Sequence, residues 1–209
     1  MSGGERQLEE WRGPFGEDYT ARNPVTEESL RQRTRALACI LDRLPGAELG
    51  SILEVGANIG LNLRALARLT GAELYAVEPN ARAREMLVKD GVVPAERALE
   101  GAAGDLPFPD GGFDLVFTAG VLIHIPEAAL EAAYREIHRV SRRYILTMEY
   151  FSPKAVTVPY HGRDEMLFKR DFGGLWLELF PGLEPVGDGF FWKRTTGLDD
   201  VTWWLFRKP

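Results

Sequence analysis

The stretch from Ser51 to Gly60, S-I-L-E-V-G-A-N-I-G, combines an acidic side chain with two glycines four residues apart. The apolar run before the glycines predicts a buried strand, and the leucines after them predict a helix. A parallel strand that passes into a helix through glycines lets a ligand approach the backbone closely. The stretch therefore predicts a site for an adenosine-type cofactor, although a tight turn without a ligand is the alternative. The expected contacts are Glu54, Gly56, Ala57, Asn58 and Gly60.

The spacing of the glycines argues against a dinucleotide. A dinucleotide fingerprint has glycines at its first, third and sixth positions, so that the pyrophosphate can lie on the helix N-terminus. Here these positions hold Gly56, Asn58 and Leu61. The carboxylate of Glu54 would also repel a pyrophosphate, whereas it suits a cationic ligand or a ribose hydroxyl. An oxidoreductase that uses a nicotinamide cofactor is therefore disfavoured.

The pattern E-x-G-x-N-x-G resembles motif I of class I S-adenosylmethionine-dependent methyltransferases, which usually reads D/E-x-G-x-G-x-G. Asn58 departs from the motif, and Asn adopts left-handed backbone conformations more readily than most residues. Glu78, with Pro79 beside it, follows an expected strand at 73–77, about 20 residues beyond the glycine loop. An acidic residue there can accept hydrogen bonds from both ribose hydroxyls.

Three further segments are predicted to complete the cofactor site. Asp105 and the Leu106 backbone follow a weak third strand expected at 98–102, and we expect them to bind the adenine amino group and a ring nitrogen. Thr118 and Ala119 follow a strand expected at 113–117 and would lie beneath the methionine moiety. In the N-terminal segment, the face of Tyr19 suits a sulfonium and the fork of Arg22 suits a carboxylate, so this segment is expected to form a lid.

Two residues are candidates for a catalytic base, which a hydroxyl acceptor would need more than other nucleophiles. His124 follows the fourth strand and titrates near neutral pH, although a histidine at a helix start or in the core is an equal alternative. Glu149, at the end of the fifth strand, is the second candidate. The three histidines have no metal-ligand spacing, so no metal is predicted.

The segment 150–172 mixes aromatic and basic side chains in a chain whose formal net charge is −6. A loop of this length at a strand's carboxyl end is more often functional than idle. We interpret it as an acceptor-binding cap, with a structural insertion as the alternative, and its basic residues indicate an acceptor with a carboxylate or phosphate. The candidate residues are Tyr150, Tyr160, Arg163, Lys169 and Arg170.

The elements that position these residues alternate strand and helix, which is typical of a parallel sheet. Besides the strands above, helices are expected at about 8–11, 26–44, 80–87, 126–140 and 175–180, and strands at 143–148, 184–192 and 201–206. The 209 residues are predicted to form a single domain. It would consist of a lid and helix (1–45), a cofactor-binding core (51–149), the cap (150–172) and a closing helix and strands (173–209).

The amino-acid composition restricts the kinds of binding partner that are expected. The acidic balance disfavours nucleic acid and favours a small-molecule acceptor. No signal peptide and no apolar run long enough to cross a bilayer is present, so a cytoplasmic protein without membrane contact is expected. The single cysteine, Cys39, lies in an apolar helical pattern and is predicted to be a buried thiol. The oligomeric state is left open.

Several segments together resemble a narrower family, the bacterial methylases associated with pseudaminic acid biosynthesis. They are F-G-E-D-Y-T-A-R-N, E-V-G-A-N-I-G-L-N-L-R-A-L, G-V-L-I-H-I, R-Y-I-L-T-M-E-Y, V-P-Y-H-G-R, L-F-K-R-D-F and D-D-V-T-W-W-L. The resemblance implies the doubly wound, Rossmann-like α/β fold of class I methyltransferases, with a mostly parallel seven-stranded sheet whose last strand is antiparallel. It also implies S-adenosylmethionine as cofactor. The basic residues of the cap indicate a small polar acceptor, such as an acidic sugar or its nucleotide conjugate. Two alternatives remain open: transfer or cyclisation of the aminobutyrate moiety with release of methylthioadenosine, and a non-catalytic cofactor-binding scaffold.

Overall fold

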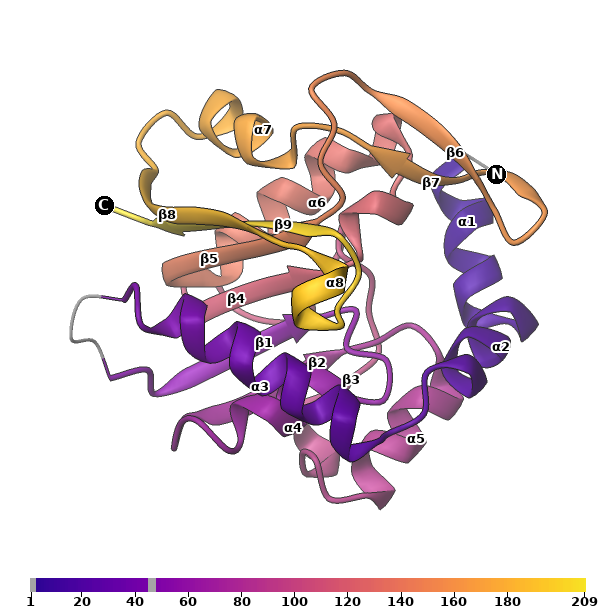
Figure 1. The fold of residues 1–209 in the computed structure, drawn as a ribbon, viewed down its shortest axis with the longest axis horizontal. Coiled ribbons are helices and arrows are strands. Elements are labelled where there is room, and N and C mark those ends of the chain that lie inside the picture. The colour runs from indigo at the N-terminus through magenta and orange to yellow at the C-terminus, as the bar shows by residue number, and fades with distance from the viewer. Residues whose placement is uncertain (1–2, 45–47) are drawn as a thin grey trace.

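A seven-stranded sheet forms the centre of the computed structural model, which describes residues 3–44 and 48–209, without the side chains of residues 3 and 163–165 (Figure 1). The strand order is β3-β2-β1-β4-β5-β9-β8. The first five strands pair in parallel, and β9 runs antiparallel to both β5 and β8. The predicted mostly parallel sheet, with an antiparallel last strand, is confirmed. The strands are β1 (Ser51–Val55), β2 (Glu73–Val77), β3 (Ala98–Leu99), β4 (Phe113–Ala119), β5 (Ser141–Glu149), β8 (Glu184–Phe191) and β9 (Val201–Arg207).

Helices cover both faces of this sheet because successive strand residues point to opposite sides. Ile52 packs into a core with α3 (Glu27–Leu41) and α4 (Leu61–Leu66), to which α5 (Ala81–Lys89) adds Leu87. The neighbouring Leu53 packs on the other face with α6 (Glu127–Val140) and α7 (Phe172–Leu179). Three single-turn helices lie in connections: η1 (Ala95–Arg97), η2 (Leu122–His124) and α8 (Lys193–Thr196).

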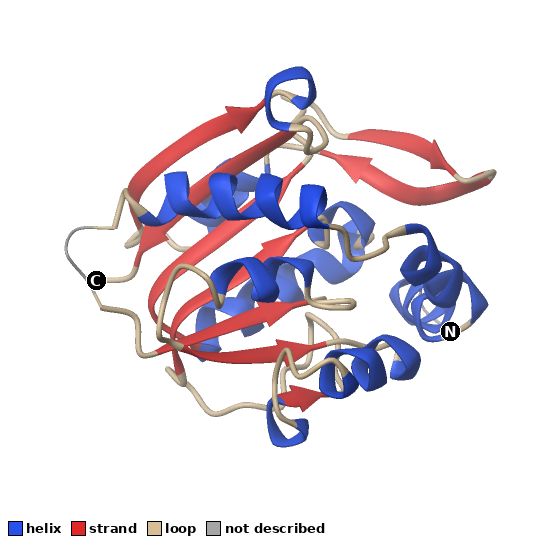
Figure 2. Cartoon of the chain, turned by 60° about the horizontal axis from the view of Figure 1, so that its bottom comes forward, coloured by secondary structure: helices blue, strands red, loops and turns tan. Residues whose placement is uncertain are grey.

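Two additions lie at the carboxyl edge of the parallel strands (Figure 2). One is the helix pair α1 (Gly3–Arg12) and α2 (Pro14–Arg22), and the other is the antiparallel hairpin of β6 (Val156–Tyr160) and β7 (Arg163–Lys169). Pro14 stands in the first turn of α2, where its missing N–H costs nothing. Because doubly wound sheets bind ligands at this edge, both additions cover the expected site.

Several boundaries differ from the sequence expectation. The third strand spans two residues and not five, because the chain turns into an isolated bridge between Ala102 and Asp105. The expected cap loop forms the β6–β7 hairpin. Cys39 is exposed, because the buried face of α3 carries Leu37 and Ile40 instead, so the expected buried thiol is wrong. The lid boundary predicted at residue 45 lies outside the described residues.

Candidate functional site

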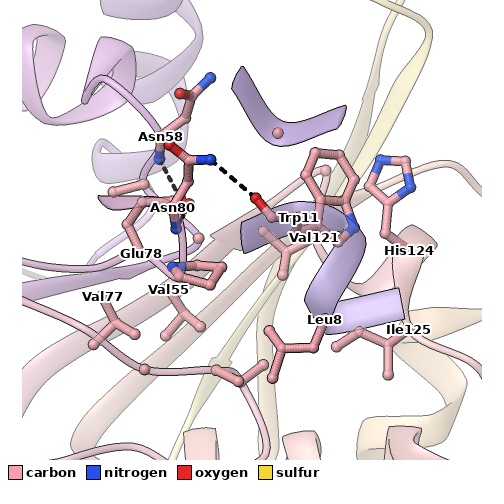
Figure 3. A pocket seen from close by; sticks show the side chains of 18 of the residues that line it. Leu8, Trp11, Val55, Asn58, Val77, Glu78, Asn80, Val121, His124 and Ile125 are labelled. Carbon is pink, nitrogen blue, oxygen red and sulfur yellow. Dashed lines mark hydrogen bonds between the residues drawn. The ribbon is translucent and has the colours of Figure 1, made fainter. Parts of the chain in front are cut away.

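A cavity of about 430 Å³ lies between the carboxyl edge of the sheet and the lid helices. This volume falls within the range of small-molecule sites. Its walls come from the loops after β1, β2, β3 and β4, from the start of α6, and from α1 and α2. Figure 3 shows Leu8 and Trp11 of α1 facing Val121, His124 and Ile125 across this space.

The glycine loop shapes the floor of the cavity. The N–H groups of Gly56 and Ala57 both donate to the Val77 carbonyl of the neighbouring strand, which ties the loops after β1 and β2 together. Gly56 has φ +75°, and a Cβ there would come within 2.5 Å of the Val121 side chain. Asn58 has φ +47°, so it takes the left-handed conformation expected of it. A side chain at position 56 would close the gap between the two loops.

Glu54 presents an unpaired carboxylate oxygen in the cavity wall. Its side chain is 2% exposed, and Oε1 accepts a hydrogen bond of 2.7 Å from Asn62 Nδ2. Oε2 is buried without a hydrogen-bond partner among the described residues. Burial raises the pKa of Glu54 to about 8, although the nearby positive charge of Arg33 opposes the rise. A cationic group of a ligand would satisfy this oxygen.

Arg33 of α3 also lines the cavity, and neither motif nor spacing identified it. Burial lowers the pKa of its guanidinium, while the negative charges of Glu54 and Asp199 oppose that change. The half-buried Arg33 and the buried Glu54 line the same cavity, which therefore contains one basic and one acidic side chain. A ligand with an ammonium and a carboxylate group, such as an α-amino acid, matches that pair.

Glu78 follows β2, as predicted, and its carboxylate organises both neighbouring loops. Oε2 accepts 2.7 Å from the Asn58 N–H, and Oε1 accepts 2.9 Å from the Asn80 N–H (Figure 3). Burial raises the pKa of Glu78, and the two backbone N–H groups act against that rise. Each oxygen keeps lone-pair capacity for ligand hydroxyls. The ribose position predicted for Glu78 is compatible with this arrangement.

Two asparagines at the rim hold the lid helices against the loops. Thr20 Oγ1 of α2 donates to Asn58 Oδ1 over 2.7 Å. Asn80 Nδ2 donates to the Trp11 carbonyl of α1 over 3.1 Å (Figure 3). Its Oδ1 caps α5 by accepting from the Ala83 N–H. Thr20 and Asn80 are buried. We call these two contacts the lid latches.

His124 lines the cavity with its ring packed between Trp11, at a centroid distance of 4.8 Å, and Tyr160, at 5.1 Å. Its Nδ1 lies 2.6 Å from the Met166 carbonyl of β7. A carbonyl only accepts, so Nδ1 carries the proton and Nε2 of the neutral ring keeps its lone pair. Burial lowers the pKa of His124 to about 4. The ring therefore stays neutral at physiological pH and offers one acceptor nitrogen.

Glu149 has a different environment from the one expected of a base. Its carboxylate is fully buried beneath the loop after β4, where Oε1 accepts from the N–H groups of Val121 and Leu122 and Oε2 from Ile123. Burial raises the pKa of Glu149 to about 7, against the effect of these N–H groups. In the part of the chain that the structure describes, Glu149 is not in the cavity wall. Its visible role is to hold the loop that carries His124.

Of the residues predicted for the cofactor, nine line the cavity: Tyr19, Glu54, Gly56, Ala57, Asn58, Glu78, Pro79, Asp105 and Ala119. Burial raises the pKa of Tyr19 to about 12, so its hydroxyl stays protonated. Asp105 is exposed and stands at the rim of the cavity.

Four other predicted cofactor residues lie outside the cavity wall, as far as the chain is described. The Leu106 N–H donates to Glu136 Oε2 over 2.9 Å, so it does not face an adenine. Thr118 is fully buried within β4. Gly60 has φ +72° at the start of α4, where a Cβ would come within 2.4 Å of Leu87. Arg22 ends α2, and its positive charge acts on Tyr160 of the hairpin.

The hairpin residues predicted to bind the acceptor have distinct surroundings. Arg170 is only 8% exposed and forms an ion pair with Glu127 at the start of α6, so its charge is already paired. Lys169 is half-buried, with its Nζ 5.5 Å from the ring centroid of Tyr150. The Tyr150 hydroxyl donates to Asp199 over 3.0 Å. The side chain of Arg163 lies outside the described residues.

Tyr160 contacts the His124 ring and connects the hairpin to the cavity. The cavity wall also contains residues that the sequence did not indicate as site residues, on the lid helices and beside the glycine and Glu78 loops. Besides Arg33 they include Gln7, Trp11, Thr20, Asn62 and Asn80.

The described residues form neither a metal-ligand cluster nor a membrane-spanning helix. No group of three His, Cys, Asp or Glu side chains within them is placed to hold a metal ion. None of the helices they form has the length and apolarity needed to cross a bilayer.

Comparison with known proteins finds a family model that matches the core of the chain. Residues 53–144 match the family model described as a methyltransferase domain. A sterol 24-C-methyltransferase of Gibberella zeae is 32% identical over 133 residues, which are 62% of this chain and 32% of that protein. A sarcosine/dimethylglycine N-methyltransferase of Halorhodospira halochloris is 34% identical over 123 residues, 57% of this chain and 42% of that protein. The chain thus spans well under half the length of these curated relatives.

Solved structures share the fold over nearly the whole chain. A Leishmania major S-adenosylmethionine-dependent methyltransferase superposes with a TM-score of 0.72 at 16% identity, covering 97% of this chain and 82% of its own. The 1,6-didemethyltoxoflavin-N1-methyltransferase of Burkholderia thailandensis was solved with bound S-adenosylhomocysteine. It superposes with a TM-score of 0.70 at 19% identity, covering 100% of this chain and 91% of its own. The narrower family suggested by the sequence segments is not among these findings. Residues 53–144 therefore match a methyltransferase domain, and the whole chain shares its fold with solved methyltransferases.

Proposed function

We propose that this protein transfers a methyl group from S-adenosylmethionine to a small polar acceptor that carries an anionic group. The observation that carries the proposal is the unpaired Oε2 of Glu54, buried in a wall that also holds the cation Arg33. Such a wall fits the amino acid end of the cofactor. Glu78 lies in the same cavity with free lone pairs for ribose hydroxyls.

The chain's residues would hold the cofactor by distinct groups. Glu54 would accept from the ammonium group and Arg33 would bind the carboxylate, while Glu78 takes the ribose and Asp105 approaches the adenine amino group from the rim. The Tyr19 ring presents an aromatic face in the same cavity. When bound, the cofactor supplies a methyl group already activated on a sulfonium. The protein then has mainly to align the acceptor and exclude water.

His124 would receive the proton that the acceptor's hydroxyl or amine loses. Its Nδ1–H is held by the Met166 carbonyl, so the Nε2 lone pair is fixed in orientation. The low pKa of His124 keeps this lone pair free at neutral pH but makes it a weak base. Its main contribution would therefore be to orient the acceptor through a hydrogen bond, with proton removal as the reaction proceeds.

The anionic group of the acceptor would lie between the lid and the hairpin. Arg170 is paired with Glu127, so Lys169 of the hairpin and Arg22 of the lid are the cations proposed for this role. An acidic sugar or its nucleotide conjugate has a suitable charge. The relatives' names mention acceptors as different as a sterol and sarcosine. The acceptor class proposed here therefore rests on the charges of this chain.

Mass spectrometry of the purified protein with S-adenosylmethionine tests the proposal. The protein is incubated alone and then with amino, hydroxy and acidic-sugar acceptors, and both nucleoside products are followed. S-adenosylhomocysteine that forms only with an acceptor supports methyl transfer. Methylthioadenosine formed without an acceptor, above its spontaneous rate, would mean that the aminobutyrate moiety reacts instead. Cofactor binding without turnover over the whole panel would favour a scaffold.

The anionic group is tested separately by kinetics of Lys169→Ala and Arg22→Ala. We expect each substitution to raise the KM for an anionic acceptor severalfold, at an unchanged KM for the cofactor. Lys154→Ala, in the connection that precedes the hairpin, is a control for loss of general positive charge. Unchanged acceptor KM values in both variants would contradict the anionic acceptor without affecting methyl transfer.

A further inference from the structure

The lid helix α1 carries a buried amide without a hydrogen-bond partner in the described part of the chain. Gln7 is 5% exposed and lines the cavity. Neither its Nε2 nor its Oε1 has a hydrogen-bond partner among the described residues. A glutamine can donate two hydrogen bonds and accept two, so this side chain leaves its whole capacity unused.

An amide in this condition is costly. Burying a polar group without a hydrogen bond lowers stability, and most buried side-chain polar atoms in native proteins are paired. An apolar residue of similar size would avoid that cost in the absence of a ligand. The position therefore makes physical sense if a ligand brings the missing donor and acceptor.

The neighbours of α1 place Gln7 at one end of the cavity. Gly4, one turn before Gln7 on α1, lies against α6, where a Cβ on it would be 3.1 Å from the Ala129 Cβ. The loop after β3 reaches the same face of α6, because a Cβ on Gly104 would lie 3.6 Å from the Ala132 Cβ. One turn after Gln7, Trp11 packs on His124. Helix α1 therefore runs from the β3 loop to the proposed acceptor end.

The end nearer the β3 loop is small and apolar. Its lining includes Ala102, Ala103, Ala132 and Ala133, with Asp105 at the rim. A flat aromatic ring fits between such small side chains. Glu78, proposed for the ribose, follows the neighbouring strand β2, so the base of the same nucleoside falls toward the β3 loop.

We propose that Gln7 recognises the adenine of the cofactor, with its carboxamide paired to the exocyclic amino group and an adjacent ring nitrogen. A glutamine amide matches this edge because one side of adenine offers a donor beside an acceptor. The proposal rests on the cofactor function above and adds a specificity-determining residue supplied by the lid. Helix α1 both covers the cavity and carries Gln7, so its closure would depend on which base is bound.

Isothermal titration calorimetry with two ligands tests this pairing without any turnover. The ligands are S-adenosylhomocysteine and its analogue with purine in place of adenine, which lacks the exocyclic amino group. Gln7→Met keeps the length of the side chain and removes both polar atoms. We expect Gln7→Met to bind S-adenosylhomocysteine about tenfold more weakly, as expected for one or two lost hydrogen bonds. The preference of wild type for adenine over purine should fall at least severalfold in the variant.

A stability readout separates this role from misfolding. The ligand-free Gln7→Met protein should have an equal or higher melting temperature, because an unsatisfied buried amide is gone. Glu9→Gln, an exposed change on the same helix, should leave both affinities unchanged. Unchanged affinity or unchanged base preference in Gln7→Met would overturn the role of Gln7. Failure of wild type itself to bind S-adenosylhomocysteine would overturn the proposed function as well.

Discussion

At the scale of single residues, the two buried acids of the cavity differ in how far the protein already satisfies them. Glu78 accepts one backbone N–H on each oxygen, whereas Glu54 has one oxygen without a partner in the described part of the chain. Burial then raises the pKa of Glu54 to about 8. The ligand-free protein therefore holds Glu54 mostly protonated at pH 7.

This protonation predicts that cofactor binding releases a proton. A bound ammonium group beside Glu54 favours the charged carboxylate and lowers its pKa, so the proton leaves as the cofactor enters. Calorimetry at pH 7 in buffers of different ionisation enthalpy should give a release of close to one proton. Glu54→Gln should bind more weakly and release almost none, and a wild-type value near zero would contradict the pairing.

The low pKa of His124 leads to a prediction about pH dependence. The ring is neutral above about pH 4, so the acidic limb of kcat/KM should not fall near 6.5, the value of an ordinary histidine. His124→Asn keeps a donor toward the Met166 carbonyl but has no group at the Nε2 position. We expect this substitution to lower kcat by about 10²-fold or more. An acidic limb near pH 6.5 that disappears in His124→Asn would show that the histidine is not neutral as described.

At the scale of elements, the lid helices are held mainly by contacts with the loops of the sheet. Helix α2 is short, and its N-cap residue is Gly13, which has no side chain that could cap the helix. Short isolated helices are marginal in water, so α1 and α2 depend on tertiary contacts. The lid latches, from Thr20 to Asn58 and from Asn80 to Trp11, supply them.

Breaking the first latch should speed the departure of the cofactor. Thr20→Val removes the donor with little change of shape, and loss of one partly buried hydrogen bond should raise the dissociation rate of S-adenosylhomocysteine about five- to tenfold. Stopped-flow tryptophan fluorescence measures this rate, because Trp11 belongs to the lid. Thr20→Ser keeps the hydroxyl and is the matched control. Equal dissociation rates for wild type and Thr20→Val would mean that the latch does not hold the lid.

The loop after β4 depends on a different anchor. Glu149 accepts three backbone N–H groups there, and a glutamine would turn an NH₂ group toward at least one of them. Glu149→Gln should therefore lower the free energy of unfolding by about 1–3 kcal/mol, as measured in urea. Glu131→Gln, on the exposed side of α6, should change it by less than about 0.5 kcal/mol. A Glu149→Gln protein as stable as wild type would contradict the anchoring role.

The buried strands could be predicted from the sequence more fully than the lid helices and the hairpin. The strands of a doubly wound sheet are buried on both faces, so β1 and β4 read as mostly apolar segments and were expected correctly. The lid is polar and interrupted by glycine and proline, and only a short helix was expected in it. The β6–β7 hairpin turns at His161 and Gly162, both with positive φ, which an apolar pattern does not reveal.

At the scale of the whole molecule, the two acidic site residues that follow strands were predictable, whereas Arg33 and Gln7 on helices were not. Glu54 and Glu78 end consecutive strands, and parallel strands bring their carboxyl ends together. Arg33 lies in the middle of α3, where its spacing resembles that of any exposed arginine. Only the packing of α3 against the sheet brings it to Glu54. The same holds for Gln7, whose burial depends on the docking of α1.

The latched lid has a consequence for the order of events in turnover. If the cofactor binds beneath α1 and α2 as proposed, its exchange should require both latches to open, while the acceptor would approach from the side of the hairpin. Binding would then follow a compulsory sequence, with the nucleoside first to enter and last to leave. Initial-rate studies should find S-adenosylhomocysteine competitive toward S-adenosylmethionine and noncompetitive toward the acceptor. Inhibition that is competitive toward the acceptor would contradict this sequence. With this binding order, S-adenosylhomocysteine would compete with S-adenosylmethionine for the free protein, so its accumulation should slow turnover.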